Sequence, residues 1–369
     1  MNLQALSLGL YIHVPFCANA CDYCHFFKLR PSKTKVRSFL EKLRQEKNFW
    51  QNELLNRLLE TIFWGGGSPS CLMEDELNEV GQLCLSFGHP KEWTVEVSPV
   101  SITKDKLIIL KNLGVTRISM GVQSFQEKTL RQLGRKQTCE QVYRAYEWIR
   151  SVGFDNVNLD LIFPPDFTSL ESWRADLKVA LQLAPEHIST YCLTYENERG
   201  PFTSDAYKKV DIEKEAMFYE YTWDFLQANG YLHYEVSNFA KAGFECLHNL
   251  NTWKMQEWIG WGPSAASQYK NRRFQNKLSL ESWQINNYIE TVELSEIDLF
   301  KDCLVFGLRM TQGIQLDTLK KRFPQIDVHG YDTLWASFQE NGWVLFDGNR
   351  VRCTPEGMLL ADSLALEIL

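Results

Sequence analysis

Short hydrophobic runs alternate with longer amphipathic segments along the first half of the chain. Apolar runs of about four to eight residues are typical of buried strands, whereas apolar residues that repeat every three or four positions are typical of helices that bury one face. The runs predict strands at 8–14, 61–64, 93–97, 117–120, 156–163 and 187–193. The amphipathic segments predict helices at 38–59, 74–87, 104–113, 139–152 and 170–183.

Strands that alternate with helices in this way favour parallel βαβ units. We therefore predict the α/β class, with a partial TIM-type (β/α)6 barrel. In such barrels, the loops that follow the strands gather at one end and carry the chemistry. Glu96, Gln123 and Asp160 are accordingly expected to lie together, beside the loop that follows strand 8–14.

The pattern changes in the second half of the chain. A helix at 211–229 precedes a Gly- and Asn-rich stretch, 231–267, that is expected to be irregular. Beyond Ser295 the sequence predicts short helices and a hairpin, at 296–308, 316–323, 331–341 and 343–353. This order is typical of a small winged-helix-like α/β module. We expect a first domain over residues 1–290 and a C-terminal domain over 291–369.

Composition and charge narrow the function classes. With 44% hydrophobic and 23% charged residues among 369, the chain is typical of a globular protein. The net charge is −7 and the basic residues form no long run, so nucleic acid is not an expected partner. No apolar run reaches the roughly 18 residues of a membrane span, and the N-terminus has no positively charged leader. We expect a cytoplasmic protein.

Three of the ten cysteines are grouped as Cys17-x3-Cys21-x2-Cys24, directly after the first predicted strand. Three thiolates on one loop can hold a small inorganic cluster, but they do not complete a tetrahedral zinc site. If His25 or a distant cysteine supplied a fourth ligand, the site would be structural zinc in a non-catalytic binding module. This alternative remains open from the spacing alone.

The cysteine triplet, with Tyr23 before its last member, resembles the defining motif of the radical SAM superfamily. The resemblance implies a radical SAM barrel in which the thiolates hold a [4Fe-4S] cluster. It further implies that S-adenosylmethionine (SAM) binds the iron left without a protein ligand, and that the protein binds and orients these groups. Gly65-Gly66-Gly67 resembles the superfamily segment that meets the SAM amino group.

Further blocks resemble the oxygen-independent coproporphyrinogen III oxidase family: Tyr11-Ile-His-Val-Pro-Phe-Cys17, Trp64-Gly-Gly-Gly-Ser-Pro69, Val95-Glu-Val-Ser-Pro99, Arg117-Ile-Ser-Met-Gly-Val-Gln-Ser-Phe125, Leu133-Gly-Arg135 and Asn158-Leu-Asp-Leu-Ile162. By this resemblance, the residues that contact cluster-bound SAM are Tyr11, Gly66 and Glu96. A second SAM-contacting set is Tyr23, Gly67, Ser68, Gln123, Arg135 and Asp160, with Thr194 and Ala266 at less specific positions. Taken singly, Glu96 and Asp160 could instead pair with Arg117 or Arg135, and Gln123 could satisfy backbone groups.

Downstream residues resemble the HemW branch of this family. His248-Asn249-Leu-Asn-Thr252-Trp253 resembles its His-Asn-x-x-Tyr-Trp motif, with Thr252 in place of the tyrosine. The resemblance implies haem binding, with His248 as an axial ligand and Trp253 covering a porphyrin face. A lone histidine is more often a hydrogen-bonded loop residue.

Two features separate this chain from the oxidase branch. Phe26 stands where that branch has another cysteine, and only ten residues precede Tyr11. The chain also departs from the usual family pattern at Gln137 and at Phe163-Pro164-Pro165, where two prolines stiffen the loop after Asp160.

The sequence therefore predicts a HemW-like radical SAM protein that binds a [4Fe-4S] cluster, SAM and haem and acts as a haem chaperone. Haem-acceptor proteins at the membrane are the expected partners. The alternative is an enzyme of porphyrin biosynthesis that oxidatively decarboxylates coproporphyrinogen III, and the zinc-stabilised module is a second alternative. Whether the chain is an enzyme, which residues would be catalytic, how many SAM molecules bind and whether it oligomerises stay open.

Overall fold

The computed structural model describes residues 7–55, 57–164, 166–193, 211–285 and 287–369. Two positions singled out from the sequence, Pro165 and Thr194, lie outside the described residues.

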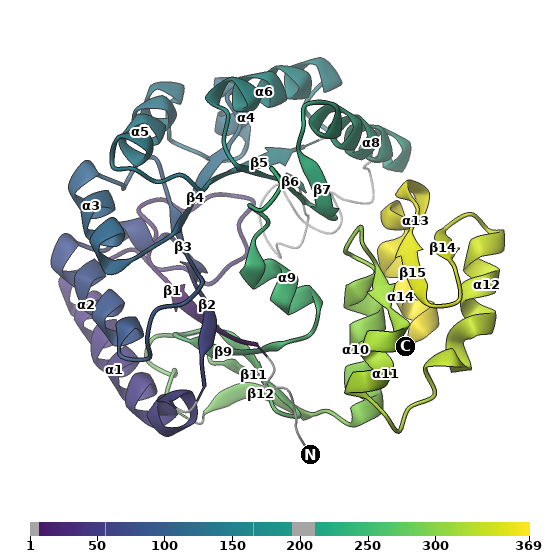
Figure 1. Cartoon of the computed structure of the whole chain (residues 1–369). Helices are drawn as coiled ribbons and strands as arrows, with labels where there is room; N and C mark the ends of the chain where they lie inside the picture. The colour runs from purple at the N-terminus through teal and green to yellow at the C-terminus, as the bar shows by residue number, and fades with distance from the viewer. Residues whose placement is uncertain (1–6, 56, 165, 194–210, 286) are drawn as a thin grey trace.

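The predicted strands and helices of the first half are confirmed. The strands β1 to β6 are Leu8–Val14, Leu59–Gly66, Glu92–Val97, Arg117–Gln123, Val157–Phe163 and His187–Cys192, and neighbours pair in parallel in chain order. The helices on the outer face are α1 (Lys33–Leu55), α2 (Glu74–Leu85), α3 (Lys104–Leu113), α4 (Glu127–Gln132), α5 (Cys139–Ser151), α6 (Leu170–Leu183) and α8 (Ile212–Ala228) (Figure 1). Helix α1 begins earlier than predicted, and Leu59 starts β2 rather than ending this helix.

The expectation of an irregular stretch over 231–267 is wrong. Its elements, and those just beyond it, are β7 (Leu232–Glu235), β8 (Asn238–Ala240), α9 (Leu247–Trp253), β9 (Glu257–Trp261), β10 (Ala266–Tyr269), β11 (Arg272–Asn276) and β12 (Tyr288–Glu293). Strand β9 pairs in parallel with β1, and β8 pairs antiparallel with β6. These strands are too short to give a clear hydrophobic period, and pairing with a preformed sheet edge stabilises them.

The barrel is open, as the partial barrel of the sequence prediction requires. The sheet order is β12-β11-β10-β9-β1-β2-β3-β4-β5-β6-β8-β7, and within the described residues the two end strands do not pair. Figure 1 looks down the curved sheet, with the helices outside and α9 lying between the sheet and the C-terminal elements.

The C-terminal elements form a small α/β module with a three-stranded sheet, as predicted. They are α10 (Glu296–Gly307), β13 (Ile314–Gln315), α11 (Leu316–Arg322), α12 (Asp332–Glu340), β14 (Val344–Phe346), β15 (Arg350–Cys353), α13 (Pro355–Leu359) and α14 (Ala361–Ile368). Backbone bonds attach this module to the β7–β8 hairpin. Val236 N–H donates to the Arg309 carbonyl at 3.0 Å, and Thr311 N–H donates to the Tyr234 carbonyl at 3.1 Å.

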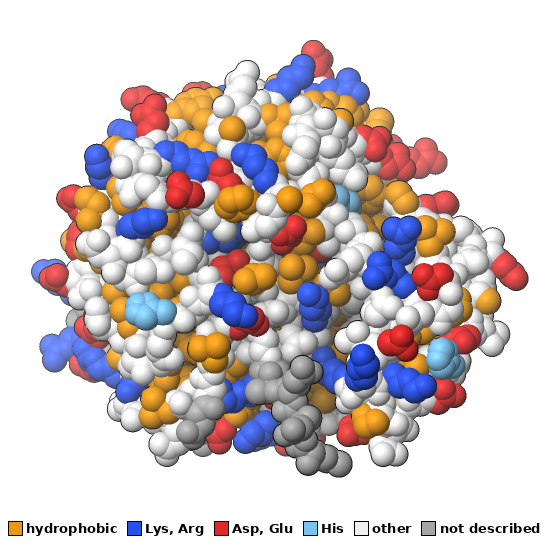
Figure 2. Space-filling view, in the orientation of Figure 1, with side chains coloured by type: hydrophobic (Ala, Val, Ile, Leu, Met, Phe, Trp, Pro, Cys, Tyr) orange, Lys and Arg blue, Asp and Glu red, His pale blue; other side chains and the backbone are white. Residues whose placement is uncertain are grey.

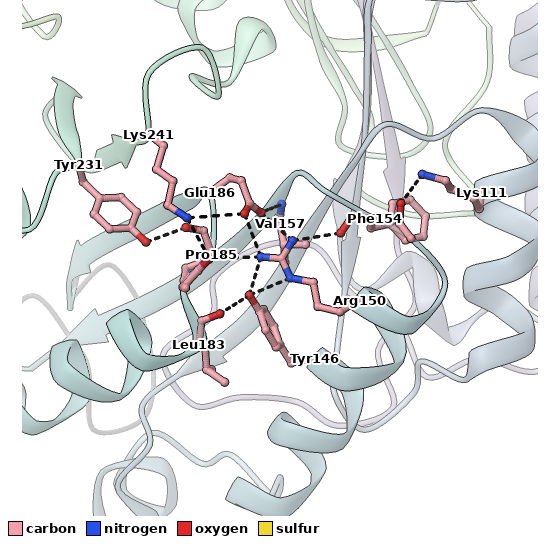
Figure 3. Close-up of polar contacts among 12 residues, drawn as sticks. Lys111, Tyr146, Arg150, Phe154, Val157, Leu183, Pro185, Glu186, Tyr231 and Lys241 are labelled. Atoms are coloured by element: carbon pink, nitrogen blue, oxygen red, sulfur yellow. Dashed lines mark hydrogen bonds and ion pairs between the residues drawn. The ribbon is translucent and has the colours of Figure 1, made fainter.

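A polar cluster ties the helices to the strands at the amino ends of β5 and β6 (Figure 3). Arg150, from α5, lies 2.8 Å from a Glu186 carboxylate oxygen and donates to the Tyr146 hydroxyl at 2.6 Å. Glu186 also accepts the Val157 N–H at 3.2 Å and lies 3.7 Å from Lys241 Nζ. Each charge in this cluster has an opposite charge or a hydrogen-bond donor beside it.

The face of the molecule seen in Figure 2 carries mixed charge. On this face, acidic and basic side chains are interspersed among hydrophobic ones. Within the described residues, no helix is long and apolar enough to cross a membrane.

Candidate functional site

A cavity of about 1010 Å³ opens at the carboxyl ends of the barrel strands. Its inner wall is formed by the cysteine loop and by residues at the ends of β2 to β6. Its outer wall comes from the β7–β8 hairpin, from α9 and from the C-terminal module, including Arg309 and Asp362. The volume lies at the upper end of the roughly 300–1,000 Å³ typical of small-molecule sites, so it has room for more than one ligand group.

The cavity collects most of the residues singled out from the sequence. Those that line it are Cys17, Cys21, Tyr23, Cys24, Gly66, Gly67, Ser68, Glu96, Gln123, Arg135 and Asp160. Tyr11, His248 and Ala266 do not line it. The parallel barrel thus brings the strand ends together as expected, although their segments are far apart in the chain.

The cysteine loop is closed at its base by strand-like pairing. Cys17 N–H donates to the Leu29 carbonyl at 3.0 Å, and Leu29 N–H donates to the Pro15 carbonyl at 2.6 Å. His13, on β1, holds the far side of the loop, because its Nε2 lies 2.9 Å from the Phe27 carbonyl. The loop is therefore anchored to β1 at both ends, and its thiols face the cavity.

The three thiols of the loop lie close enough to influence one another. Burial and, after it, the neighbouring thiols Cys71, Cys24 and Cys21 raise the pKa of Cys17 to about 12. Burial also raises the pKa of Cys21, while the Arg135 guanidinium opposes this effect. No group of three His, Cys, Asp or Glu side chains in the described part of the chain is arranged to hold a single metal ion.

The donor set fits an iron–sulfur cluster. Thiolates are the usual ligands of such clusters, and a cluster is larger than a single ion, so its ligands do not need to meet at one point. Arg135 places a positive charge beside the loop, which offsets the negative charge of thiolates. Cys17, Cys21 and Cys24 are thus the residues that would hold the cluster.

The glycine run is dictated by close packing against β1. Gly67 N–H donates to the Val14 carbonyl at 2.9 Å, and a Cβ on Gly67 would lie 2.8 Å from the backbone oxygens of Val14 and Phe16. Gly66 has a φ of 98°, which is unfavourable for other residues. The run therefore lets the end of β2 lie close against β1, and Gly66 and Gly67 line the cavity beside the cysteine loop.

Glu96 lies directly over this run. Its carboxylate is 3.0 Å from the position of a Gly65 Cβ, and the Gly66 backbone donates a hydrogen bond to it. Burial and, to a lesser extent, the nearby Asp160 raise the pKa of Glu96 to about 8. A carboxyl group in this state holds a proton near neutral pH and is poised to ionise when a cation binds.

Asp160 forms the second carboxylate of the inner wall. It accepts hydrogen bonds from Asn158 Nδ2 at 2.8 Å and from Ser119 Oγ at 3.1 Å. Burial raises its pKa, and the charge of Arg117 opposes the effect. Within the described residues, neither Glu96 nor Asp160 forms an ion pair with an arginine, so the strand-end pairing considered from the sequence is absent there.

The Leu133-Gly134-Arg135 block packs on the cysteine loop. A Cβ on Gly134 would lie 2.5 Å from the Asp22 carboxylate, and Arg135 donates to the Gly121 carbonyl at 3.4 Å. Tyr23 packs on an apolar group that includes Leu133. Arg135 and Tyr23 thereby join the loop to β4.

Gln123 and Gln137 have different roles at the end of β4. Gln123, at a φ of 70°, lines the cavity. The side-chain amide of Gln137, the residue that departs from the family pattern, donates to the carbonyl of Val122. The sequence suggested that Gln123 could form hydrogen bonds with backbone groups at the end of this strand, and Gln137 does so instead.

Helix α9 is held by a buried carboxylate at its first turn. Glu92 accepts the N–H groups of Leu247 at 2.9 Å and of His248 at 3.0 Å. A carboxylate at this end of a helix also interacts favourably with the helix dipole.

His248 points from α9 into the barrel, away from the cavity wall. Its Nδ1 lies 2.9 Å from Thr61 Oγ1, and its ring packs on Phe63 with centroids 5.1 Å apart. Burial and, to a lesser extent, the charge of Arg117 lower its pKa to about 4, so the imidazole is neutral at neutral pH. Asn249, Thr252 and Trp253 of the same helix line the cavity instead.

Several cavity residues were not singled out from the sequence. They are Cys71, Tyr191, Cys192, Tyr219, Glu235, Asn238 and Arg309. Those of the outer wall come from segments that meet only in the folded protein, so their shared place in the cavity could not be predicted from the sequence. Cys71 lies four residues after Gly67, and this position near the glycine run is the one signal that pointed to it.

Tyr11 lies below the cavity on β1. Its hydroxyl is 3.2 Å from His13 Nδ1, and its ring is 6.3 Å from that of Phe63. Burial raises its pKa, and the proximity of Glu96 adds to the effect. It is therefore a neighbour of the inner wall rather than part of it.

Comparison with protein families matches residues 11–178 to the radical SAM superfamily and residues 294–360 to the HemN C-terminal domain. Among curated proteins, the chain is 32% identical over 378 residues to the heme chaperone HemW of Bacillus subtilis (strain 168), covering 96% of this chain and 97% of that protein. It is 36% identical over 272 residues to the heme chaperone HemW of Escherichia coli (strain K12), covering 70% and 69%.

Among solved structures, the fold is similar to that of coproporphyrinogen III oxidase (HemN) from Escherichia coli, described as a radical SAM enzyme. The TM-score is 0.83 at 23% identity, and the match covers 99% of this chain and 90% of that chain. At this identity the likeness concerns the fold.

Proposed function

This chain belongs to the HemW family of radical SAM proteins, and from that premise we propose that it is a haem chaperone that binds a [4Fe-4S] cluster, SAM and haem. One observation carries the proposal. The inner wall of a single cavity has three neighbouring cysteine thiols and two carboxyl groups, and its outer wall has the aromatic residue Trp253 of α9.

The inner wall is the proposed site of the cluster and SAM. Cys17, Cys21 and Cys24 hold the cluster, which supplies an electron and an iron with an open coordination position when it is bound. Glu96 and Asp160 offer negative charge to the cationic groups of SAM.

The remaining inner-wall residues orient SAM in this proposal. Its polar contacts come from the backbone of the glycine run and from side chains around the cavity, namely Gly66, Gly67, Ser68, Tyr23, Gln123 and Arg135. Tyr11 acts from below, through Glu96 and His13.

Helix α9 is the proposed haem-binding element. Trp253 presents an aromatic surface to the cavity, against which a porphyrin face can pack. His248 is the proposed axial ligand, because its imidazole is neutral and the Thr61 contact occupies Nδ1, which leaves Nε2 for iron. Since the ring lies inside the barrel, ligation requires α9 to shift toward the cavity.

Two further parts of the proposal concern organisation and partners. We place the boundary between the barrel and the C-terminal module near residue 290, so that both units contribute to the outer wall. The haem is passed to acceptor proteins at the membrane.

The decisive experiment uses the full-length protein under anaerobic reducing conditions, with analysis of metal content, haem titration and haem transfer to an apo haem protein. We expect iron and sulfide rather than zinc, a haem spectrum on titration and transfer of the haem. Failure to bind haem would overturn the proposal. Formation of protoporphyrinogen from added coproporphyrinogen III would instead identify a porphyrinogen oxidase.

The role of His248 has its own test. His248→Ala is expected to change the haem absorption spectrum and lower haem affinity, whereas His329→Ala, at an exposed position of the C-terminal module, is the matched control. An unchanged spectrum in His248→Ala would remove the ligand assignment and leave the chaperone proposal to the binding and transfer measurements.

A further inference from the structure

The outer wall of the cavity contains an arginine that has no role in the proposed binding of the cluster and SAM at the inner wall. Arg309 follows α10 in the C-terminal module and lines the cavity. Its backbone carbonyl accepts the Val236 N–H, which fixes it at the joint between the module and the β7–β8 hairpin.

The Arg309 guanidinium lies on an aromatic platform. It is 5.1 Å from the centroid of the Trp253 ring, and Trp253 in turn stacks on Phe306 with centroids 6.1 Å apart at 19°. Cation–π contact with Trp253 and the backbone anchor orient the guanidinium. The cavity therefore presents a positive charge directly beside the aromatic surface of α9.

The anion now paired with Arg309 is a weak partner. Arg309 Nη1 lies 3.3 Å from the Asp362 carboxylate, whose side chain is 97% exposed. Ion pairs at such exposed positions contribute little to stability because water screens them. Arg309 Nε is buried, and among the described residues it has no hydrogen-bond partner. Since buried donors almost always find a partner, this guanidinium has unused capacity for an acceptor.

The other buried or anchored cations of the cavity belong to the inner wall. Lys28 Nζ donates to the Cys24 carbonyl, and Arg135 lies beside Tyr23 and the cysteine thiols. Arg309 lies instead on the side of α9 and the C-terminal module.

We propose that Arg309 is the carboxylate-binding residue on the outer wall of the cavity, and that it binds a propionate of a tetrapyrrole whose ring packs on Trp253. The identity of the ligand rests on the proposed function. Haem combines a flat apolar ring with two propionates, and the aromatic surface and guanidinium match these two parts. Arginine suits the task because its planar fork binds a carboxylate through two parallel hydrogen bonds. The ligand carboxylate replaces that of Asp362.

Glu235 is the anion that such a ligand meets next to Arg309. It is buried, and its carboxyl group accepts hydrogen bonds from the Asn238 side-chain amide and from the Ser237 N–H. Burial raises its pKa, and the charge of Arg309 opposes this effect. Its own hydrogen bonds limit how far Glu235 competes with the ligand for the guanidinium.

The test compares haem with haem dimethyl ester, which keeps the ring and iron but has no free carboxylates. The full-length protein, Arg309→Gln, Arg309→Lys and the exposed control Arg350→Gln are titrated with both compounds, and thermal unfolding is measured for each. We expect Arg309→Gln to lower haem affinity about tenfold while ester affinity is unchanged. Arg309→Lys keeps the charge but loses the fork, so its loss is expected to be smaller. Arg350→Gln should alter neither affinity.

Two results separate failure of this inference from failure of the proposed function. If the unmodified protein binds haem, but Arg309→Gln and Arg309→Lys leave haem affinity unchanged or weaken haem and ester equally, the carboxylate role is overturned and the chaperone proposal stands. If the unmodified protein binds neither compound, the proposed function itself fails. If Arg309→Gln does not fold, the haem-to-ester ratio of Arg309→Lys decides the question.

Discussion

The two ends of the barrel strands treat charged side chains in opposite ways. At the amino ends of β5 and β6, Arg150, Glu186 and Lys241 are paired with one another and with backbone groups (Figure 3). At the carboxyl ends, Glu96 and Asp160 line a cavity and form no ion pair with an arginine among the described residues, and burial raises both pKa values. At the amino ends the charged groups find their partners within the chain, whereas at the carboxyl ends the two carboxyl groups are available to a ligand.

This difference separates stability from binding. Partnered charges hold helices against the sheet, whereas carboxyl groups held in unfavourable surroundings are typical of sites that bind or react. In parallel barrels, residues at the carboxyl ends of the strands carry function and those at the amino ends carry stability. Substitutions at the carboxyl ends of the strands should therefore weaken ligand binding and leave the stability of the fold unchanged. Substitutions at the amino ends should lower stability and leave ligand binding unchanged.

The largest effect is expected from the cysteine loop. Replacing Cys17, Cys21 or Cys24 by Ala should abolish the iron and sulfide content, because a cluster held by two thiolates is not retained. Chemical analysis of anaerobically reconstituted protein measures this loss. Cys71→Ala is the matched control, since Cys71 lines the same cavity outside the triplet, and it should keep full iron content. Equal loss in the control would mean that the triplet alone does not define the site.

The next effect concerns Glu96. Glu96→Gln removes the negative charge offered to a cationic ligand and should weaken SAM binding between about tenfold and hundredfold, as loss of a charge-assisted hydrogen bond does. Because the buried carboxylate is disfavoured in the empty site, thermal unfolding should not move to lower temperature. Isothermal titration and a thermal melt together measure both quantities. If Glu96→Gln unfolded at a lower temperature and bound SAM with normal affinity, Glu96 would serve stability rather than binding, contrary to the proposed difference between the two ends.

The opposite result is expected at the other end of the barrel. Arg150→Met leaves Glu186 and the Tyr146 hydroxyl without their principal partner, and should lower the free energy of unfolding by about 2 kcal/mol. Denaturant unfolding measures this change. SAM affinity and iron content should equal those of the unmodified protein, and any loss of either at full folding would show that the two ends are coupled.

The smallest effect is a pH dependence. Glu96 has a pKa of about 8 in the empty site, so below this value the group is protonated and neutral. SAM affinity should therefore rise with pH, by at most about tenfold between pH 7 and pH 9, and level off above. Titrations across this range in Glu96→Gln should lose this rise and keep only the pH dependence that comes from Asp160 and from the amino group of SAM itself. A wild-type profile that falls with pH would exclude Glu96 as the titrating group.

Much of the inner site could be predicted from the sequence, because each of its parts lies within one short segment. The cysteine triplet, the glycine run and the strand-end residue Glu96 are each readable locally, and parallel βαβ order then places them at one end. Helix α4 and the strands on both sides of the six-stranded core were not predicted, because they are too short to give a period.

His248 illustrates the limit of a local motif. The sequence gives its type and its helix neighbours, but the direction of its ring depends on Thr61 and Phe63 of β2. The same holds for Arg309, which reaches Trp253 only because the C-terminal module pairs with the β7–β8 hairpin.

The sequence by itself determined the order of strands and helices, the thiol donors and the polar residues at the strand ends, since these follow from hydrophobic period and residue chemistry over a few positions. The tertiary structure decided that short strands extend the sheet on both sides of the six-stranded core, that α9 turns His248 inward and Trp253 outward, and that Arg309 faces the cavity. Those features depend on contacts between segments far apart in the chain. The free energy of such contacts cannot be predicted from the residue pattern of any one segment.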